Sequence, residues 1–422
     1  MNDWSELSRN QLLELLMENR ERYEWIRGQN LKLDLSRGKP SADILDLSNG
    51  LLGALDTWKT EDGVDIRNYG VPTGINECKK LFSELLGIPE ESLIIGGNSS
   101  LSHMYNVFTL LYLFGPAEHT PWVRQDRIKI LCPCPGYDRH FTLTEDFGAE
   151  MVPVPMTEDG PDMDVVEDMV AHDSAIKGIW CIPLYSNPTG VVYSDETVRR
   201  LASMKTAAAD FRIFWDNAYG VHHVFKEHKI ADIMKLSQDA GNEERVYYFF
   251  STSKITFPGG GLGMVAAGPK SVAQLKKHIG KQTIGYDKIT QLKTVKFFGT
   301  PDGIRRHMKK VSDLLRPKFE LVLSTLKNQF EGTGLVTWVT PKGGYFISID
   351  VPEGCAKKVV ELAKEAGATL TGAGATWPYK NDPRDTNIRI APTFPSLEEL
   401  EKTMDLLTVC IKIVGIEKML EA

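Results

Sequence analysis

The feature that most constrains the fold is a series of short apolar segments, each followed by a polar loop and a stretch of helical periodicity. Six such segments lie between residues 93 and 250, at 93–97, 128–131, 151–154, 179–182, 211–215 and 245–250. Short buried strands that alternate with helices are typical of a mostly parallel sheet with helices on both faces. We therefore predict an α/β fold for this part of the chain.

The two ends of the chain have a different pattern. Ser8 and Gln11 have the spacing of a capping box before a helical pattern of leucines, and residues 31–36 alternate like a strand. After about residue 290, a long helical stretch precedes further short elements, with strands expected at 336–339, 343–350 and 387–390 and a helix at 356–366. This mixture predicts a second, smaller α+β unit.

The charge balance narrows the classes of function. Lys and Arg number 49 against 56 Asp and Glu, which gives a net charge of -7 with no basic tail and argues against a nucleic-acid partner. The N-terminus lacks the basic and apolar regions of a signal peptide, and the late apolar run 406–416 is shorter than the ~20 residues that span a bilayer. We expect a cytoplasmic protein with no membrane segment.

The cysteines give no indication of a metal site. Six are scattered along the chain, and only Cys132 and Cys134 lie close together, with one residue between them. Metal-ligand spacing would need a second pair or a histidine cluster nearby, so we expect reduced structural thiols and no bound metal.

Polar side chains follow three consecutive predicted strands. Asn187 comes after the strand at 179–182, Asp216 and Tyr219 after 211–215, and Lys254 after 245–250. Ligands of parallel sheets bind beyond the carboxyl ends of the strands, where these side chains would meet. Taken alone, the segment Ser251-Thr-Ser-Lys254 favours a solvated loop lysine. The ordered set of Asn, Asp with Tyr, and Ser with Lys instead favours a Schiff-base lysine beside phosphate ligands.

The sequence resembles the fold-type I pyridoxal-phosphate enzymes, specifically the class I/II aminotransferases. The resemblance runs from about Leu31 to the C-terminus and is most like subgroup Ic of the aspartate aminotransferases. It rests on the motifs Asn-Pro-x-Gly, Asp-x-x-Tyr, Ser-x-Ser-Lys and a late Asn-x-Arg, and on the segments 33–41, 135–140 and 251–257. It implies a seven-stranded-type sheet in a large cofactor domain of residues 49–290. A small domain would be formed by both chain ends, with 1–48 as an N-terminal arm and part of that domain and 291–422 as the rest.

The resemblance assigns catalytic roles to residues at the strand ends. Lys254 would hold pyridoxal 5'-phosphate as an internal aldimine and then move the proton between Cα and C4′ of the cofactor–substrate adduct. Asp216 would pair with the pyridine nitrogen. Asn187 and Tyr219 would donate hydrogen bonds to the phenolate oxygen.

Further residues would complete cofactor binding. Tyr137 would stack on the pyridine ring, and Tyr69 resembles a tyrosine that reaches the phosphate of the neighbouring subunit, which implies a homodimer with shared sites. The phosphate would be bound at a helix N-terminus with the serine hydroxyls of Ser99, Ser100, Ser251 and Ser253. For Ser99 and Ser100, plain N-capping is an alternative reading.

One position departs from the family pattern. The family usually places an arginine for the phosphate eight residues after the lysine, where this chain has Leu262 within a glycine-rich loop. Phosphate binding would then depend more on hydroxyls, loop amides and the helix N-terminus.

Substrate binding is assigned in the same way. Arg389 resembles the arginine that binds the substrate α-carboxylate, and its planar guanidinium suits two parallel hydrogen bonds. Gly38 resembles a glycine of close approach beside the substrate, where Asn187 also contributes. A dicarboxylic substrate needs a second cation, for which Arg37 is our first candidate, ahead of Lys39 and Lys288.

The resemblance implies a ping-pong transamination from an L-amino acid, with aspartate and 2-oxoglutarate as the expected pair. Alternatives are a pyridoxal-phosphate lyase and a transaminase of 2-aminoadipate or aromatic amino acids. A regulator domain that binds the cofactor is a third alternative, although only about thirty residues precede Leu31, too few for a DNA-binding domain.

Overall fold

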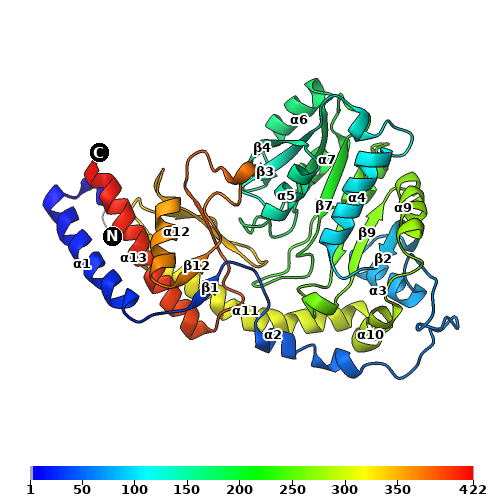
Figure 1. The fold of residues 1–422 in the computed structure, drawn as a ribbon, viewed down its shortest axis with the longest axis horizontal. Coiled ribbons are helices and arrows are strands. Elements are labelled where there is room, and N and C mark those ends of the chain that lie inside the picture. Colours follow the sequence, from blue (N-terminus) through cyan, green and yellow to red (C-terminus); the bar gives the residue numbers. More distant parts are fainter. Residues whose placement is uncertain (1–2, 422) are drawn as a thin grey trace.

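The computed structural model describes residues 3–421, and its centre is an eight-stranded sheet (Figure 1). The strand order is β2-β9-β8-β7-β6-β3-β4-β5. The strands are β2 (Leu93–Ile95), β3 (Lys129–Cys134), β4 (Glu150–Thr157), β5 (Gly160–Pro161), β6 (Ile176–Cys181), β7 (Arg212–Asp216), β8 (Val246–Ser251) and β9 (Gly263–Ala267). The α/β prediction is confirmed: the eight strands include the six predicted segments together with β5 and β9, against the seven strands that the resemblance implies.

Most of this sheet is parallel. Strands β8, β7, β6, β3 and β4 run in one direction, while β9 is antiparallel to both of its neighbours, β8 and β2. Strand β2 is therefore parallel to β8, and the carboxyl ends of all these strands except β9 lie at one edge. The sequence analysis did not predict β9.

Successive side chains of the strands enter two separate cores. In β7, Ile213 and Trp215 belong to one buried cluster and Phe214 to the other. Both faces are therefore covered, as expected for parallel strands. The covering helices are α3 (Asn76–Leu86), α4 (Ser100–Phe114), α5 (Asp138–Asp146), α6 (Met163–His172), α7 (Asp195–Ser203), α8 (Ile233–Asp239) and α9 (Pro269–Gln282).

The two ends of the chain lie side by side, away from the large sheet (Figure 1). Strand β1 (Leu33–Leu35) pairs in parallel with β12 (Ala368–Leu370), while β10 (Thr337–Trp338), β11 (Ile347–Asp350) and β13 (Asn387–Ile390) form an antiparallel sheet. Helix α1 (Arg9–Arg27) packs along α13 (Leu397–Glu421), with ion pairs Arg20–Glu417 and Arg22–Asp405, both 2.6 Å. The domain boundaries at residues 48 and 290 stay a prediction.

Helices α2 (Ala42–Asp46), α10 (Lys288–Phe298) and α11 (Pro301–Phe330) run between these parts (Figure 1). Helix α12 (Ala356–Glu365) packs on α13 and β12, within the part formed by the chain ends. The capping box at Ser8 and Gln11 is present at the start of α1. Within residues 3–421, no helix is long and apolar enough to cross a membrane, and no group of three or more potential metal ligands occurs.

Candidate active site

Three predicted residues lie at the carboxyl edge of adjacent strands. Strands β6, β7 and β8 are neighbours in the sheet, and Asn187, Asp216 and Lys254 follow or end them in that order. The Nζ atom of Lys254 lies 5.0 Å from the ring centroid of Tyr219 and 6.0 Å from that of Tyr345. Burial against these rings lowers the pKa of Lys254, while the charge of Asp216 raises it. Lys254 is therefore an amine that loses its proton more readily than an ordinary lysine.

The aromatic ring of Tyr219 lies next to the Lys254 amine. Its ring is buried and stacks on Tyr345, with centroids 6.0 Å apart and an angle of 25° between the planes. Burial raises its pKa well above the usual value, with a smaller effect of Tyr137 and Asp216. The phenol therefore keeps its proton and can donate a hydrogen bond.

Asp216 is held by a histidine that the sequence analysis did not assign. The Nε2 atom of His140 lies 3.0 Å from Oδ2 of Asp216, and both residues are only 2% exposed. The His140 ring is fixed by stacking on Trp180 at 4.2 Å and lies edge-on to Tyr137 at 5.0 Å. The other carboxylate oxygen, Oδ1, is buried and has no hydrogen-bond partner within residues 3–421. A buried acceptor of this kind requires a donor.

The predicted phosphate ligands come from two segments that are brought together by β9. The amide of Gly263 donates to the carbonyl of Gly97 and the amide of Gly96 donates to the carbonyl of Gly263, both at 3.0 Å. A Cβ atom on Gly263 would lie 2.4 Å from the carbonyl oxygen of Ser99, so only glycine permits this approach. The hydroxyl of Ser253 donates to the carbonyl of Asn98 at 3.4 Å. Residues 97–100 and 251–253 therefore form one polar surface at the N-terminus of α4.

The serines predicted to bind the phosphate differ in their hydrogen bonding and burial. Ser99 caps α4, because its hydroxyl accepts from the amide of Ser102 at 3.3 Å. Ser100 is the first residue of that helix, and Ser251 is buried at the end of β8. The capping reading of Ser99 is therefore correct, and it does not compete with the anion site because a capped N-terminus still presents its other amides.

Leu262 cannot replace the arginine expected by the family pattern. It is 1% exposed, belongs to the core, and exchanges hydrogen bonds with Thr252: its amide donates to Oγ1 at 2.8 Å and its carbonyl accepts from the Thr252 amide at 2.9 Å. The position is structural here.

Arg389 lies on β13 and is buried with all three guanidinium nitrogens engaged. Its Nη1 donates to Oδ1 of Asp138 at 3.0 Å and to Oδ1 of Asn187 at 3.2 Å. Its Nε and Nη2 donate to the hydroxyl of Thr371 at 3.3 and 3.2 Å, and the guanidinium lies 4.8 Å above the Phe346 ring. Arg389 is thus connected directly to Asn187 at the large sheet.

Gly38 lies against the residues that support Arg389. A Cβ atom there would be 2.6 Å from Cζ of Phe346 and 3.2 Å from Cδ1 of Tyr345. The close approach in the structure is to the Phe346 ring, and the predicted place of Gly38 beside the substrate stays a prediction. The adjacent Arg37 is exposed and has no ion pair in the described chain.

The other two candidate cations are already engaged. Lys39 lies 3.7 Å from Asp34 and 4.9 Å from the Phe394 ring. Lys288 is 3% exposed, and its ammonium group donates to the carbonyls of Asn68 at 2.5 Å and Gly70 at 3.2 Å. Lys288 is therefore a buried support for the Tyr69 loop. Tyr69 itself is 78% exposed.

Several residues of the site carry no signal that the sequence analysis used. Asp138 and His140 fall within the quoted segment 135–140 but received no role, and Thr371 and His222 were not considered. Asp138 and His140 lie at the start of α5, soon after strand β3. They could have been noted as polar residues that follow a predicted strand. Their contacts with Asp216 and Arg389 depend on packing between distant segments.

Comparison with known proteins identifies the family of the chain. The family model described as aspartate amino-transferase matches residues 7–422. A Mycolicibacterium smegmatis protein named as an aminotransferase is 48% identical over 421 residues, with 98% of each chain covered. The aspartate aminotransferase of Corynebacterium glutamicum is 43% identical over 402 residues, covering 94% of this chain and 93% of that one. A crystal structure of an aspartate transaminase from the same organism has a TM-score of 0.96 at 42% identity, with 99% of each chain covered.

These matches and the fold define the protein as an aminotransferase. Within that class, the chain belongs to the aspartate aminotransferase family.

Proposed function

We propose that this aminotransferase uses pyridoxal 5'-phosphate to transfer the amino group of L-aspartate to 2-oxoglutarate in a ping-pong cycle. The observation that carries the proposal is the convergence of a partly buried amine, Lys254, a buried carboxylate oxygen without a partner, Oδ1 of Asp216, and Arg389 at one edge of the sheet. The residues fit the cofactor because a protonated pyridine nitrogen would supply the donor that Oδ1 of Asp216 requires.

Two groups of residues at this edge of the sheet would bind the cofactor, one at its ring and the other at its phosphate. Asp216, supported by His140, would bind the ring nitrogen, and Tyr137 would lie against the ring. Asn187 would donate through its amide, because its carbonyl oxygen accepts from Arg389, and Tyr219 would donate through its phenol. The N-terminus of α4 with Ser99, Ser100, Ser251 and Ser253 would bind the phosphate, without an arginine at position 262.

When bound, the cofactor withdraws electrons from the substrate Cα and so acidifies its proton. Lys254 would accept that proton at Nζ and return it, a role that its lowered pKa favours because the amine is then available in its neutral form. Arg389 would fix the α-carboxylate and so orient the Cα–H bond toward Lys254.

For the distal carboxylate of aspartate, Arg37 is the proposed cation. It is exposed, unpaired within residues 3–421, and adjacent to Gly38, which packs on the Phe346 ring beneath Arg389. We expect Arg37→Ala to raise the KM for aspartate about tenfold or more and to reduce the preference for aspartate over alanine. Lys32→Ala, at an exposed neighbouring position, is the matched control. An unchanged KM and preference in Arg37→Ala would eliminate Arg37.

The reaction itself is tested with a panel of amino donors. We expect aspartate to convert the absorbance of the bound cofactor to that of its amine form, and 2-oxoglutarate to restore it with one equivalent of glutamate. A lyase would give products without stoichiometric glutamate, and a different best donor would replace aspartate in the proposal.

Lys254 is tested separately. Lys254→Ala should bind the cofactor without the borohydride-stable attachment that the unsubstituted protein forms, whereas Lys226→Ala, at an exposed position, should retain it. Retention of the attachment in Lys254→Ala would reject the assignment.

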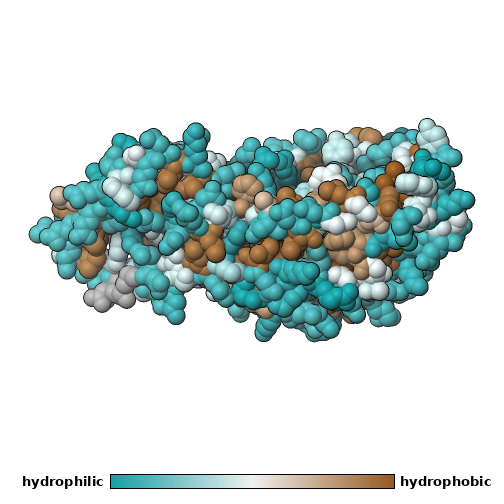
Figure 2. Space-filling model, turned by 90° about the horizontal axis from the view of Figure 1, so that it is seen from below, coloured by the Kyte–Doolittle hydropathy of each residue, from teal (hydrophilic) through white to brown (hydrophobic). Residues whose placement is uncertain are grey.

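We also propose a homodimer in which Tyr69 completes the site of the partner. Figure 2 views the molecule from the side on which α2, α10 and α11 lie in Figure 1, and hydrophobic residues form several brown areas along it. Large apolar residues at exposed positions include Leu52, Trp58, Tyr69 and Ile284. The segments of Tyr69 and Ile284 pack together, since Gly285 approaches the Gly70 carbonyl and Lys288 binds Asn68 and Gly70. Exposed apolar surface of this kind marks an interface.

A further inference from the structure

His222 lies at the junction of three segments of the site. Its Nε2 atom is 3.2 Å from the backbone carbonyl oxygen of Lys254. Its ring meets the Tyr219 ring edge-on at 5.8 Å and the Tyr345 ring edge-on at 5.5 Å. These are the two rings that face the Lys254 amine, so one imidazole touches both the backbone of the lysine and the walls around its side chain.

The backbone of His222 extends the junction toward Arg389. Its amide donates to the Tyr219 carbonyl at 2.9 Å, and its carbonyl accepts from the Gly344 amide at 3.1 Å. A Cβ atom on Gly343 would lie 2.7 Å from that carbonyl, so the segment that leads to Phe346 fits closely against His222. Phe346 in turn supports the guanidinium of Arg389.

The surroundings determine the form of the imidazole. A carbonyl oxygen only accepts hydrogen bonds, so Nε2 must carry the hydrogen. Nδ1 is buried without a partner within residues 3–421, and a proton there would be an unpaired buried donor next to the cationic form of Lys254. Burial accordingly lowers the pKa of His222 to about 3, and the imidazole is neutral at ordinary pH.

We propose that His222 is a positioning residue of the reaction. Its Nε2–H bond to the Lys254 carbonyl and its edge contacts with Tyr219 and Tyr345 hold the lysine amine in the position from which it moves the substrate Cα proton. The inference rests on the proposed function of Lys254. His222 does not itself transfer the proton. It acts by holding Lys254 and the side chains of Tyr219 and Tyr345.

The test compares two substitutions that separate the hydrogen bond from the ring. His222→Phe keeps an aromatic ring but removes the donor, whereas His222→Gln keeps an amide donor at a similar reach. We expect kcat to fall about 10- to 100-fold in His222→Phe with a smaller change in KM, and to recover most of this loss in His222→Gln. Equal loss in both variants, or no loss in either, would overturn the proposal.

A second readout does not depend on activity. In the full-length chain freed of cofactor, the pH dependence of acetylation at Lys254 can be followed by peptide mass spectrometry. If His222→Phe releases the lysine toward solvent, its profile should move to higher pH by about half a pH unit or more, while His222→Gln stays near the unsubstituted protein. If the acetylation profile of a folded His222→Phe protein does not move, the positioning role of His222 is contradicted, whether or not the protein proves to be a transaminase. A profile that moves without any transaminase activity would instead reject the proposed function alone.

Discussion

At the scale of single residues, Asp138 places a negative charge beside the guanidinium of Arg389, which is proposed to bind the substrate α-carboxylate. Its Oδ1 lies 3.0 Å from Nη1 of Arg389, and its side chain is 30% exposed. The pair orients Arg389, but the charge of Asp138 also opposes the approach of a carboxylate. The two effects can be separated by an isosteric substitution.

We predict that Asp138→Asn lowers the KM for aspartate about three- to tenfold, on the order of 1 kcal/mol, because the amide oxygen can still accept from Nη1 while the opposing charge is lost. Steady-state kinetics measure this. Asp138→Ala, which loses the acceptor as well, should raise the KM. A higher KM in Asp138→Asn would show that the charge itself stabilises the substrate-binding form of Arg389.

The Lys254 amine gives a prediction about pH. Burial lowers its pKa and the charge of Asp216 raises it, so removing that charge should lower the pKa further. In Asp216→Asn, the acetylation profile of Lys254 in the cofactor-free chain should therefore move to lower pH, because more of the amine is neutral at each pH. Lys402, an exposed residue of α13, is the internal control and should not move. A shift of Lys254 to higher pH would contradict the electrostatic account.

Among these residues, some could be predicted and others could not. Lys254, Asp216, Asn187 and Arg389 fall in short motifs with characteristic spacing, and the strand pattern places the first three at one edge. The contacts of Asp138, His140 and His222 join segments from 32 to 251 residues apart. No local pattern records such contacts, so they required the structure.

At the scale of elements, the same reasoning explains which strands were predicted. Strands β6, β7 and β8 are apolar runs flanked by polar loops, and each was expected. Strand β9 is a five-residue run directly after a glycine-rich loop in which only Val265 is β-branched and none is aromatic, so it lacks the residue types that marked the equally buried β6, β7 and β8. It is nevertheless the element that brings residues 97–100 toward 251–253.

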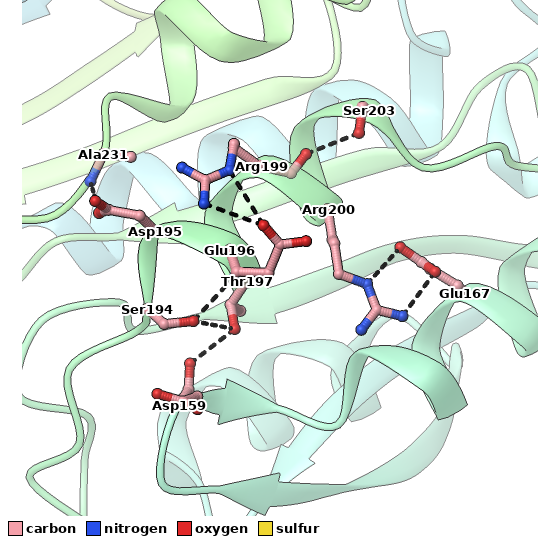
Figure 3. A network of polar contacts seen from close by, with 10 residues as sticks. All are labelled: Asp159, Glu167, Ser194, Asp195, Glu196, Thr197, Arg199, Arg200, Ser203 and Ala231. Carbon is pink, nitrogen blue, oxygen red and sulfur yellow. Dashed lines mark hydrogen bonds and ion pairs between the residues drawn. The ribbon is translucent and has the colours of Figure 1, made fainter.

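Helix α7 shows how a surface element is fixed beside the sheet (Figure 3). Ser194 caps its N-terminus, accepting from the Thr197 amide at 3.2 Å, and the Thr197 hydroxyl donates to the Asp159 carbonyl at 2.9 Å. Arg200 makes two hydrogen bonds to Glu167, at 3.0 and 2.8 Å. The helix is thereby joined to the β4–β5 hairpin and to α6.

We predict that Ser194→Ala lowers the free energy of unfolding by about 1 kcal/mol, because the first turn of α7 loses its cap. Ser203→Ala is the control in the same helix. Among residues 3–421, the Ser203 hydroxyl bonds only to the Arg199 carbonyl of the same helix, so its loss should change the free energy of unfolding by less than about 0.5 kcal/mol. Urea denaturation measures both, and kcat should be unchanged because neither serine lies at the site. Equal effects of the two substitutions would mean that the cap contributes no more than a surface hydroxyl.

At the scale of the whole molecule, the exposed position of Tyr69 supports the proposed homodimer. Its side chain is 78% exposed, and its loop is anchored from beneath by Lys288. A buried support under an exposed aromatic residue suits a side chain that is presented to another molecule. In a symmetric dimer, each Tyr69 would then reach the site whose Lys254 belongs to the partner chain.

Hybrid dimers test this arrangement. Tyr69→Ala and Lys254→Ala should each be defective alone, Lys254→Ala completely. In a mixed dimer, one site combines both defects, whereas the other takes Lys254 from one chain and Tyr69 from the other and is native. Random reassociation of equal amounts after mild denaturation should therefore restore about a quarter of the native sites, measured by aspartate turnover, and each protein treated alone should show no such gain. If Tyr69 serves its own chain, no mixed dimer contains a native site, and activity would stay at the average of the two parents.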